Sequence, residues 1–122
     1  MKVETCRALS DAWLEFRWLL YPPSREPPGV LDEEAVGPRG TTCAQTVAKA
    51  RLVFGLESEA GNAADEIDKK IAQLEEVALA RRPWDEAARK TVRTCITAAE
   101  DAHKDFLLKA HVAIRPDVPW HP

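Results

Sequence analysis

The chain has 122 residues, of which 45% are hydrophobic and 30% charged, and its formal net charge is −3. This length and apolar content predict one folded domain, 1–122, with one core, and exclude a disordered chain. The acidic balance argues against a general nucleic-acid binder and against a polybasic membrane contact, because both need a basic surface.

The three cysteines, Cys6, Cys43 and Cys95, are odd in number and far apart, and no Cys-x-x-Cys pair occurs. The first residues lack the apolar run of a signal peptide, and the predicted helices carry a charge every few residues. We therefore expect a reduced cytoplasmic protein that does not bind a membrane or nucleic acid.

The first predicted helix covers about 3–20. Its apolar residues recur at spacings of three and four, which is the pattern of one buried stripe: Cys6, Leu9, Trp13, Phe16 and Leu20. The sequence Tyr21-Pro22-Pro23 predicts its end, because proline has no N–H to donate and restricts the residue before it.

The segment 22–40 differs from the rest because it holds five of the nine prolines and three of the five glycines. It is predicted to be an irregular crossover, with at most a short helical turn over 30–36. Connections of this length are uncommon in compact domains and are often functional.

Two further helices are predicted over 42–60 and 63–81. The first of them carries Cys43, Val47, Ala50 and Phe54 on one stripe. Gly61 is expected to end it in a left-handed conformation, and Asn62 to cap the next helix.

The last predicted helix runs over 83–112, with Pro83 in the favoured first position, and an extended tail over 115–122 follows it. No stretch of the chain alternates in the manner of a strand. The sequence therefore predicts an all-α fold, a small antiparallel four-helix bundle with a long Pro/Gly-rich crossover between helices 1 and 2.

One pattern on the last helix suggests a metal site. Glu100 and His103 form a Glu-x-x-His element, which di-iron bundles combine with glutamates of neighbouring helices. Mirroring the last two helices about their turn sets Glu66 level with Glu100. A homodimer would have to supply the missing second element, and the cofactor would then be iron or manganese.

The aromatic residues suggest a contact surface. Trp18 does not fit the buried stripe of the first helix and shares a polar face with Leu14. Tyr21 follows on the same helix, and Trp120 stands between prolines in the tail. Tryptophan on a polar face either packs under another segment of its own chain or meets a partner.

No nucleophile elbow, phosphate loop or complete metal-ligand set occurs, and no family is recognised. The favoured interpretation is a non-enzymatic interaction module, such as a small adaptor, inhibitor or accessory subunit, which binds another protein and has no cofactor. Its expected contact residues are Leu14, Trp18, Tyr21 and Trp120, with the crossover and the tail. The alternatives are a metal-dependent oxidoreductase assembled as a homodimer around Glu66, Glu100 and His103, and a helical ligand-sensing module.

Overall fold

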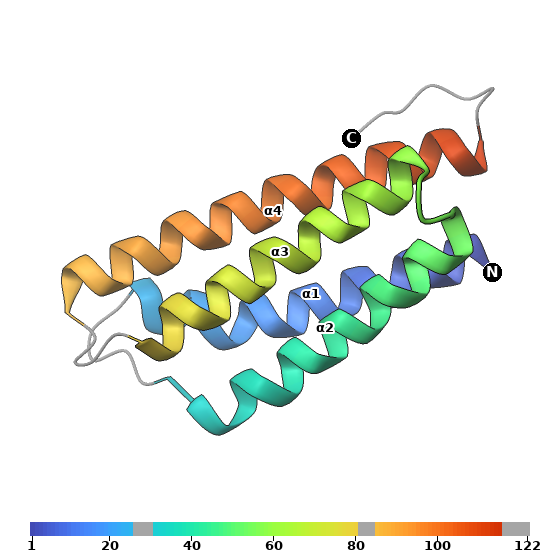
Figure 1. The fold of residues 1–122 in the computed structure, drawn as a ribbon. Helices are drawn as coiled ribbons and strands as arrows, with labels where there is room; N and C mark the ends of the chain where they lie inside the picture. The colour runs from blue at the N-terminus through green and yellow to red at the C-terminus, as the bar shows by residue number, and fades with distance from the viewer. Residues whose placement is uncertain (26–30, 81–84, 116–122) are drawn as a thin grey trace.

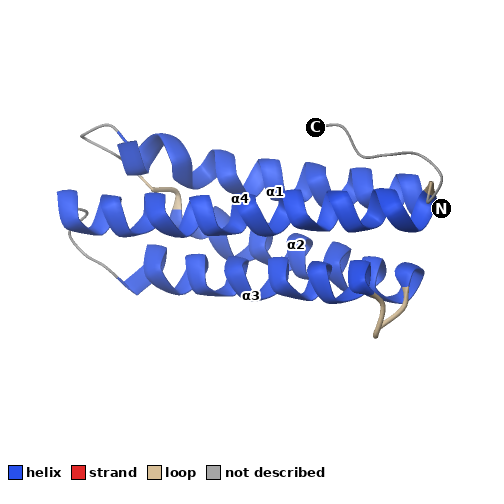
Figure 2. Ribbon diagram, turned by 90° about the horizontal axis from the view of Figure 1, so that it is seen from above, coloured by secondary structure: helices blue, strands red, loops and turns tan. Residues whose placement is uncertain are grey.

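A computed structural model of the chain describes residues 1–25, 31–80 and 85–115. These residues form four helices, α1 (Lys2–Arg25), α2 (Glu33–Phe54), α3 (Glu59–Ala80) and α4 (Glu86–Ile114), and the described ranges contain no strand. The main contacts join α1 to α2, α2 to α3, α3 to α4 and α4 back to α1 (Figures 1 and 2). The prediction of an all-α helical bundle is therefore confirmed.

Two contacts show which parts of α1 and α2 lie side by side. The ammonium of Lys2, at the start of α1, lies 5.7 Å from the ring centroid of Phe54, at the end of α2. Farther along α1, the thiol of Cys43 in α2 donates to the carbonyl of Ala12. The start of α1 thus lies beside the end of α2, and the middle of α1 lies beside the middle of α2 (Figure 1).

The core contains the stripes predicted for the first two helices, with Cys6 and Phe54 partly buried at its edge. The largest fully buried side chains include Trp13, Phe16 and Phe106, and Phe106 meets Phe54 edge to face with ring centroids 5.9 Å apart. The core residues of α3 are Ala63, Ala64, Ile67, Ile71, Leu74 and Ala78. No helix in the described part of the chain has an apolar stretch long enough to cross a membrane.

The predicted end of the first helix at Tyr21 is wrong, because α1 continues through Pro22 and Pro23 to Arg25. Ser24 is fully buried in this last turn, and its hydroxyl donates to the carbonyl of Tyr21 at 2.7 Å. The guanidinium of Arg93 in α4 donates to the carbonyl of Ser24. The burial of Ser24 and the contact from Arg93 offset the backbone hydrogen bonds that the two prolines cannot make.

The predicted irregular segment 22–40 is also wrong over most of its length. Besides the last turn of α1, it contains the start of α2, which begins at Glu33 and has Pro38 inside it. Val36 and Gly40 are buried and extend the stripe of Cys43 toward the N-terminus at helical spacing. This burial outweighs the single hydrogen bond lost at Pro38. The part of the predicted crossover over 26–30 lies outside the described residues.

The turn between α2 and α3 lies earlier than predicted. Gly55, not Gly61, adopts a positive φ of 104°, and α2 ends at Phe54. Ser58, not Asn62, caps α3, because its hydroxyl accepts from the N–H of Gly61 at 2.9 Å. Gly61 lies within α3, where a Cβ atom would stand 2.0 Å from the carbonyl oxygen of Gly55. The chain therefore needs glycine at 55 for its conformation and at 61 for its close approach to the turn.

The predicted start of the last helix at Pro83 is too early, because Asp85 has an extended backbone and precedes the helix; Pro83 itself lies outside the described residues. In the structure α4 starts at Glu86 and continues to Ile114, beyond the predicted end at Val112. Its cap is Asp85, whose carboxylate accepts from the N–H of Ala88 at 2.8 Å. This bond satisfies one of the free N–H groups of the first turn.

Replacing Asp85 with alanine is expected to lower the free energy of unfolding by about 1 kcal/mol, because it removes this capping bond. Asp32 is the matched control, since it occupies the cap position of α2 without a side-chain capping bond. Urea unfolding followed by circular dichroism measures both variants. Equal losses for Asp85→Ala and Asp32→Ala would contradict the role given to the Asp85 carboxylate.

Candidate interaction surface

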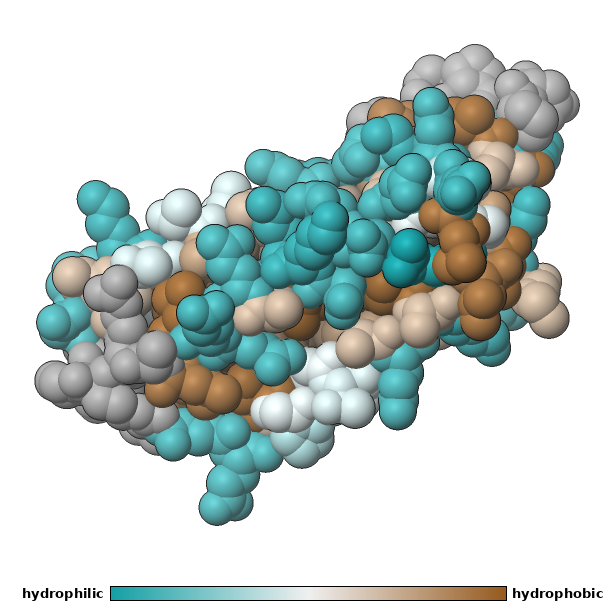
Figure 3. Space-filling view, in the orientation of Figure 1, coloured by the Kyte–Doolittle hydropathy of each residue, from teal (hydrophilic) through white to brown (hydrophobic). Residues whose placement is uncertain are grey.

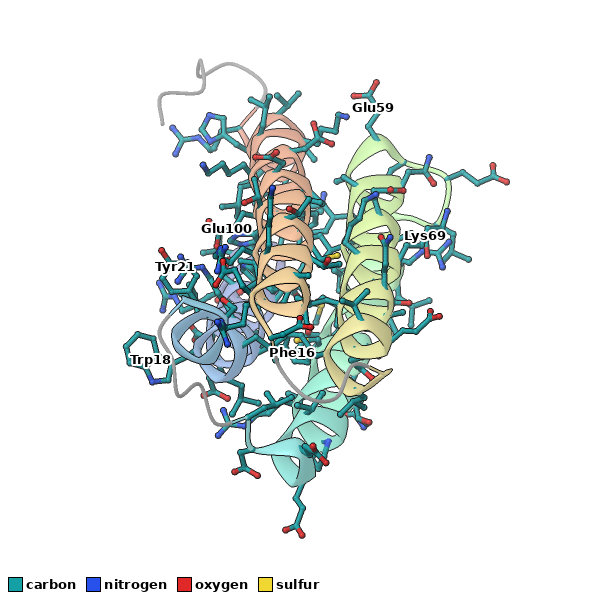
Figure 4. The ribbon with its side chains drawn as sticks, turned by 90° about the vertical axis from the view of Figure 1, so that its left-hand side faces the viewer. Phe16, Trp18, Tyr21, Glu59, Lys69 and Glu100 are labelled. Carbon is teal, nitrogen blue, oxygen red and sulfur yellow. The ribbon has the colours of Figure 1, made fainter. Side chains whose placement is uncertain are left out.

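The outer face of α1 carries two exposed apolar side chains, Leu14 and Trp18, which are 53% and 71% exposed. They lie one helical turn apart, on either side in sequence of the fully buried Phe16. Two residues along a helix correspond to a rotation of about 200°, so the burial of Phe16 turns both side chains outward. Figure 4 shows Phe16 among the helices and Trp18 pointing away from them.

Trp18 is not covered by another segment in the described part of the chain. The sequence left open whether it packs under its own chain or meets a partner, and among the described residues it is 71% exposed. Beside it lies a hollow of about 320 Å³ lined by Leu14, Glu15, Arg17, Trp18, Leu19 and Arg39. Glu15 and Arg39 form an ion pair of 3.0 Å there, which links α1 to α2.

Tyr21 lies on the other flank of this face and is only partly exposed. The guanidinium carbon of Arg17 lies 4.4 Å from the centroid of its ring. Both residues also line a second hollow, of about 370 Å³, between α1 and α4. The structure thus brings together Leu14, Trp18 and Tyr21, three of the four predicted contact residues, on one helix. The fourth, Trp120, lies outside the described residues.

Glu100 and His103 hold α1 against α4. Oε1 of Glu100 accepts from the indole Nε1 of Trp13 at 3.1 Å and lies 3.0 Å from Nε of Arg17. One turn along, Nε2 of His103 lies 2.8 Å from the hydroxyl oxygen of Ser10. The Glu-x-x-His element therefore joins α4 to α1 through polar contacts, and Figure 4 shows Glu100 on the side of α4 that faces α1. We call Glu100 and His103, with their partners Ser10, Trp13 and Arg17, the clasp.

The proposed metal ligands are not assembled into one site. Glu66 lies on α3 and its carboxylate is 3.7 Å from the ammonium of Lys70. Oε1 of Glu100 already lies next to the guanidinium of Arg17 and the indole N–H of Trp13. Within the described residues, no group of three or more His, Cys, Asp or Glu side chains is placed to hold a metal ion.

The cysteines do not have the properties of nucleophiles. Burial raises the pKa of all three thiols, and nearby carboxylates, Glu75 first among them, help raise the pKa of Cys43 to about 12. A reactive cysteine needs a lowered pKa, since the thiolate is the attacking species. Cys6, Cys43 and Cys95 are therefore packing residues.

Burial lowers the pKa of His103 below its ordinary value, and the nearby Glu100 opposes this shift. A histidine whose pKa is lowered by folding contributes stability at pH values above the pKa that it has in the unfolded chain, near 6.5. This contribution is lost as the pH falls from there through the lowered pKa of the folded protein. We expect wild type to lose more stability between about pH 7.5 and pH 5.5 than His103→Gln, which cannot take up the proton.

Urea unfolding of both proteins at the two pH values isolates this contribution. Other titratable groups, including Glu75, whose pKa burial raises, are common to both chains and cancel in the difference. Identical pH dependence of wild type and His103→Gln would contradict the assignment.

Sequence reasoning missed the clasp because neither the Ser10–His103 contact nor the Trp13–Glu100 contact follows from spacing along one helix. It also missed Arg39, which lay in the segment predicted to be irregular. Comparison of the chain with protein-family models, with curated proteins and with solved structures finds no match.

Proposed function

We propose that this protein is a non-enzymatic interaction module, a small adaptor, inhibitor or accessory subunit, whose binding surface is the outer face of α1. The observation that carries the proposal is the high exposure of Trp18 next to Leu14 on one helix. An exposed tryptophan with an apolar neighbour is the kind of residue that dominates the energy of protein interfaces.

The fixed orientation of α1 in the bundle supports the proposal. The clasp of Glu100 with Trp13 and Arg17 fixes the rotation of α1, so that Trp18 is held outward. A rigid helix that presents its side chains in advance loses little conformational entropy on binding. The hollow beside Trp18 offers room for one large apolar side chain of a partner.

The described residues also expose apolar side chains elsewhere, which provides a control. Leu52 and Leu56 are 73% and 53% exposed near the end of α2, and Figure 3 shows hydrophobic residues at that end of the bundle. Single exposed apolar residues are ordinary. Leu52→Ala therefore removes as exposed a side chain as Trp18→Ala does, at a site not assigned to the partner.

The test is affinity capture from cells that make this protein, with quantitative mass spectrometry. Wild type, Trp18→Ala, Trp120→Ala and Leu52→Ala serve as baits. We expect Trp18→Ala to lose a partner that Leu52→Ala retains, and loss in Trp120→Ala would add the tail to the surface. An unchanged partner profile in Trp18→Ala and Trp120→Ala would refute the proposal.

A second candidate is a ligand-sensing module, for which the hollow of about 370 Å³ between α1 and α4 is the supporting observation. Its size lies within the range of small-molecule sites, and Arg17, Arg93 and Lys104 line it together with Glu100 and Asp101. A thermal-shift screen of small carboxylates, phosphates and amino acids tests it. Stabilisation that Lys104→Ala abolishes would support this candidate, and the absence of any stabilising compound would remove it.

A further inference from the structure

We infer that the outer face of α1 binds a second copy of this chain, with the two α1 helices packed antiparallel about a two-fold axis. The inference rests on the proposed function, because it names the partner of the same face. Three features of that face support it: the spacing of its apolar side chains, the charges beside them and the adjoining hollow.

The spacing of the apolar side chains fits a helical partner. Leu14, Trp18 and Tyr21 follow one another at intervals of four and three residues, which is how a helix presents a narrow seam to another helix. Arg7 and Asp11 continue this face toward the N-terminus and are exposed. The two most exposed apolar side chains of the seam, Leu14 and Trp18, are centred on residue 16.

A two-fold axis at residue 16 makes the Leu14–Trp18 part of the seam complementary to itself and sets Tyr21 of one copy opposite Asp11 of the other. In an antiparallel pair about that axis, residue 14 of one copy lies opposite residue 18 of the other. Each Leu14 then packs against the Trp18 of the second copy, which is the reciprocal contact of an isologous interface. The hollow of about 320 Å³ beside Trp18 receives part of the opposing seam.

The charges beside the seam obey the same symmetry. Glu15 of α1 and Arg39 of α2 form a 3.0 Å ion pair at the level of the axis, and both side chains are substantially exposed. In the inferred arrangement the two-fold axis passes between Glu15 and Arg39, so that it sets each pair against its own copy with the order of the charges reversed. The guanidinium of one copy then faces the carboxylate of the other, so four charges alternate in sign, which favours this register.

The small extent of the face sets the expected strength. One helix and its flanks from each copy give an interface near the low end of the roughly 1,200–2,000 Å² of stable complexes. We therefore expect a dissociation constant in the micromolar range.

Sedimentation velocity of the full chain, from about 1 to 300 µM, tests the inference. Wild type is expected to shift from monomer toward dimer over this range. Trp18→Ala and Leu14→Ala are expected to weaken the dimer at least about tenfold, whereas Leu52→Ala leaves it unchanged. Circular dichroism confirms that each variant keeps its helices, as expected for exposed positions.

A charge exchange tests the register itself. Arg39→Glu sets four carboxylates around the axis and is expected to abolish the dimer, whereas the double variant Glu15→Arg/Arg39→Glu restores alternating charges and recovers it. A wild-type chain that stays monomeric throughout, or a dimer indifferent to Trp18→Ala and Leu14→Ala, overturns the inference. A monomeric wild type whose capture of a different protein still depends on Trp18 overturns this inference alone and leaves the proposed function standing.

Discussion

Replacing Trp13 with alanine is expected to lower the free energy of unfolding by about 3–5 kcal/mol, among the largest losses from one side chain in this protein. Trp13 is fully buried between α1 and its neighbours, and its ring stacks near that of Phe16 with centroids 6.5 Å apart. The substitution leaves a cavity, because the surrounding core closes only in part. It also removes the indole N–H that donates a hydrogen bond to Glu100.

Two further variants separate the causes of this loss. Trp13→Phe keeps most of the apolar volume and removes the indole N–H, so it is expected to cost about 1–3 kcal/mol. Trp18→Ala makes the same change as Trp13→Ala at an exposed position and is expected to stay within about 0.5 kcal/mol of wild type. Urea unfolding monitored by circular dichroism measures all three. Similar losses at Trp13 and Trp18 would contradict the assignment of one to the core and the other to the surface.

Replacing Gly61 with alanine is the second substitution with a large expected effect. The new Cβ would meet the carbonyl oxygen of Gly55 at 2.0 Å, and this oxygen belongs to the backbone of the turn. The same oxygen accepts from the N–H and the hydroxyl of Ser58, so it cannot move without loss of the turn. We expect a loss of at least about 1–3 kcal/mol from this overpacking.

Gly37 provides the matched control. It lies exposed inside α2, and an added Cβ would have no atom within 4 Å apart from those of its chain neighbours. The preference of a helix for alanine over glycine favours this substitution, whereas contact of the new Cβ with the ring of Pro38 opposes it, so its net effect is expected to stay within about 1 kcal/mol of wild type. Thermal and urea unfolding should therefore show a clearly larger loss for Gly61→Ala than for Gly37→Ala. Equal losses would refute the close approach of Gly61 to Gly55.

The interior of the helices was predictable from the sequence, and the ends were not. Spacings of three and four residues identified Trp13, Phe16 and Leu20 in α1 because burial of one helix face imposes that period. The ends depended on proline and glycine, whose local preferences are weak compared with tertiary burial. Ser24 and Val36 became helical because they are buried against other parts of the chain, a contribution that local rules do not contain.

For the candidate surface, too, one part was predictable from the sequence and another was not. The outward position of Trp18 followed from the sequence, because its place relative to Phe16 is set by the helical repeat. Only the tertiary structure decided that no described segment covers it, that Arg39 stands beside it, and that Glu100 and His103 bind α1 instead of forming a ligand set. Periodicity along one helix determines which way a side chain points, whereas contacts between helices depend on how the whole bundle packs.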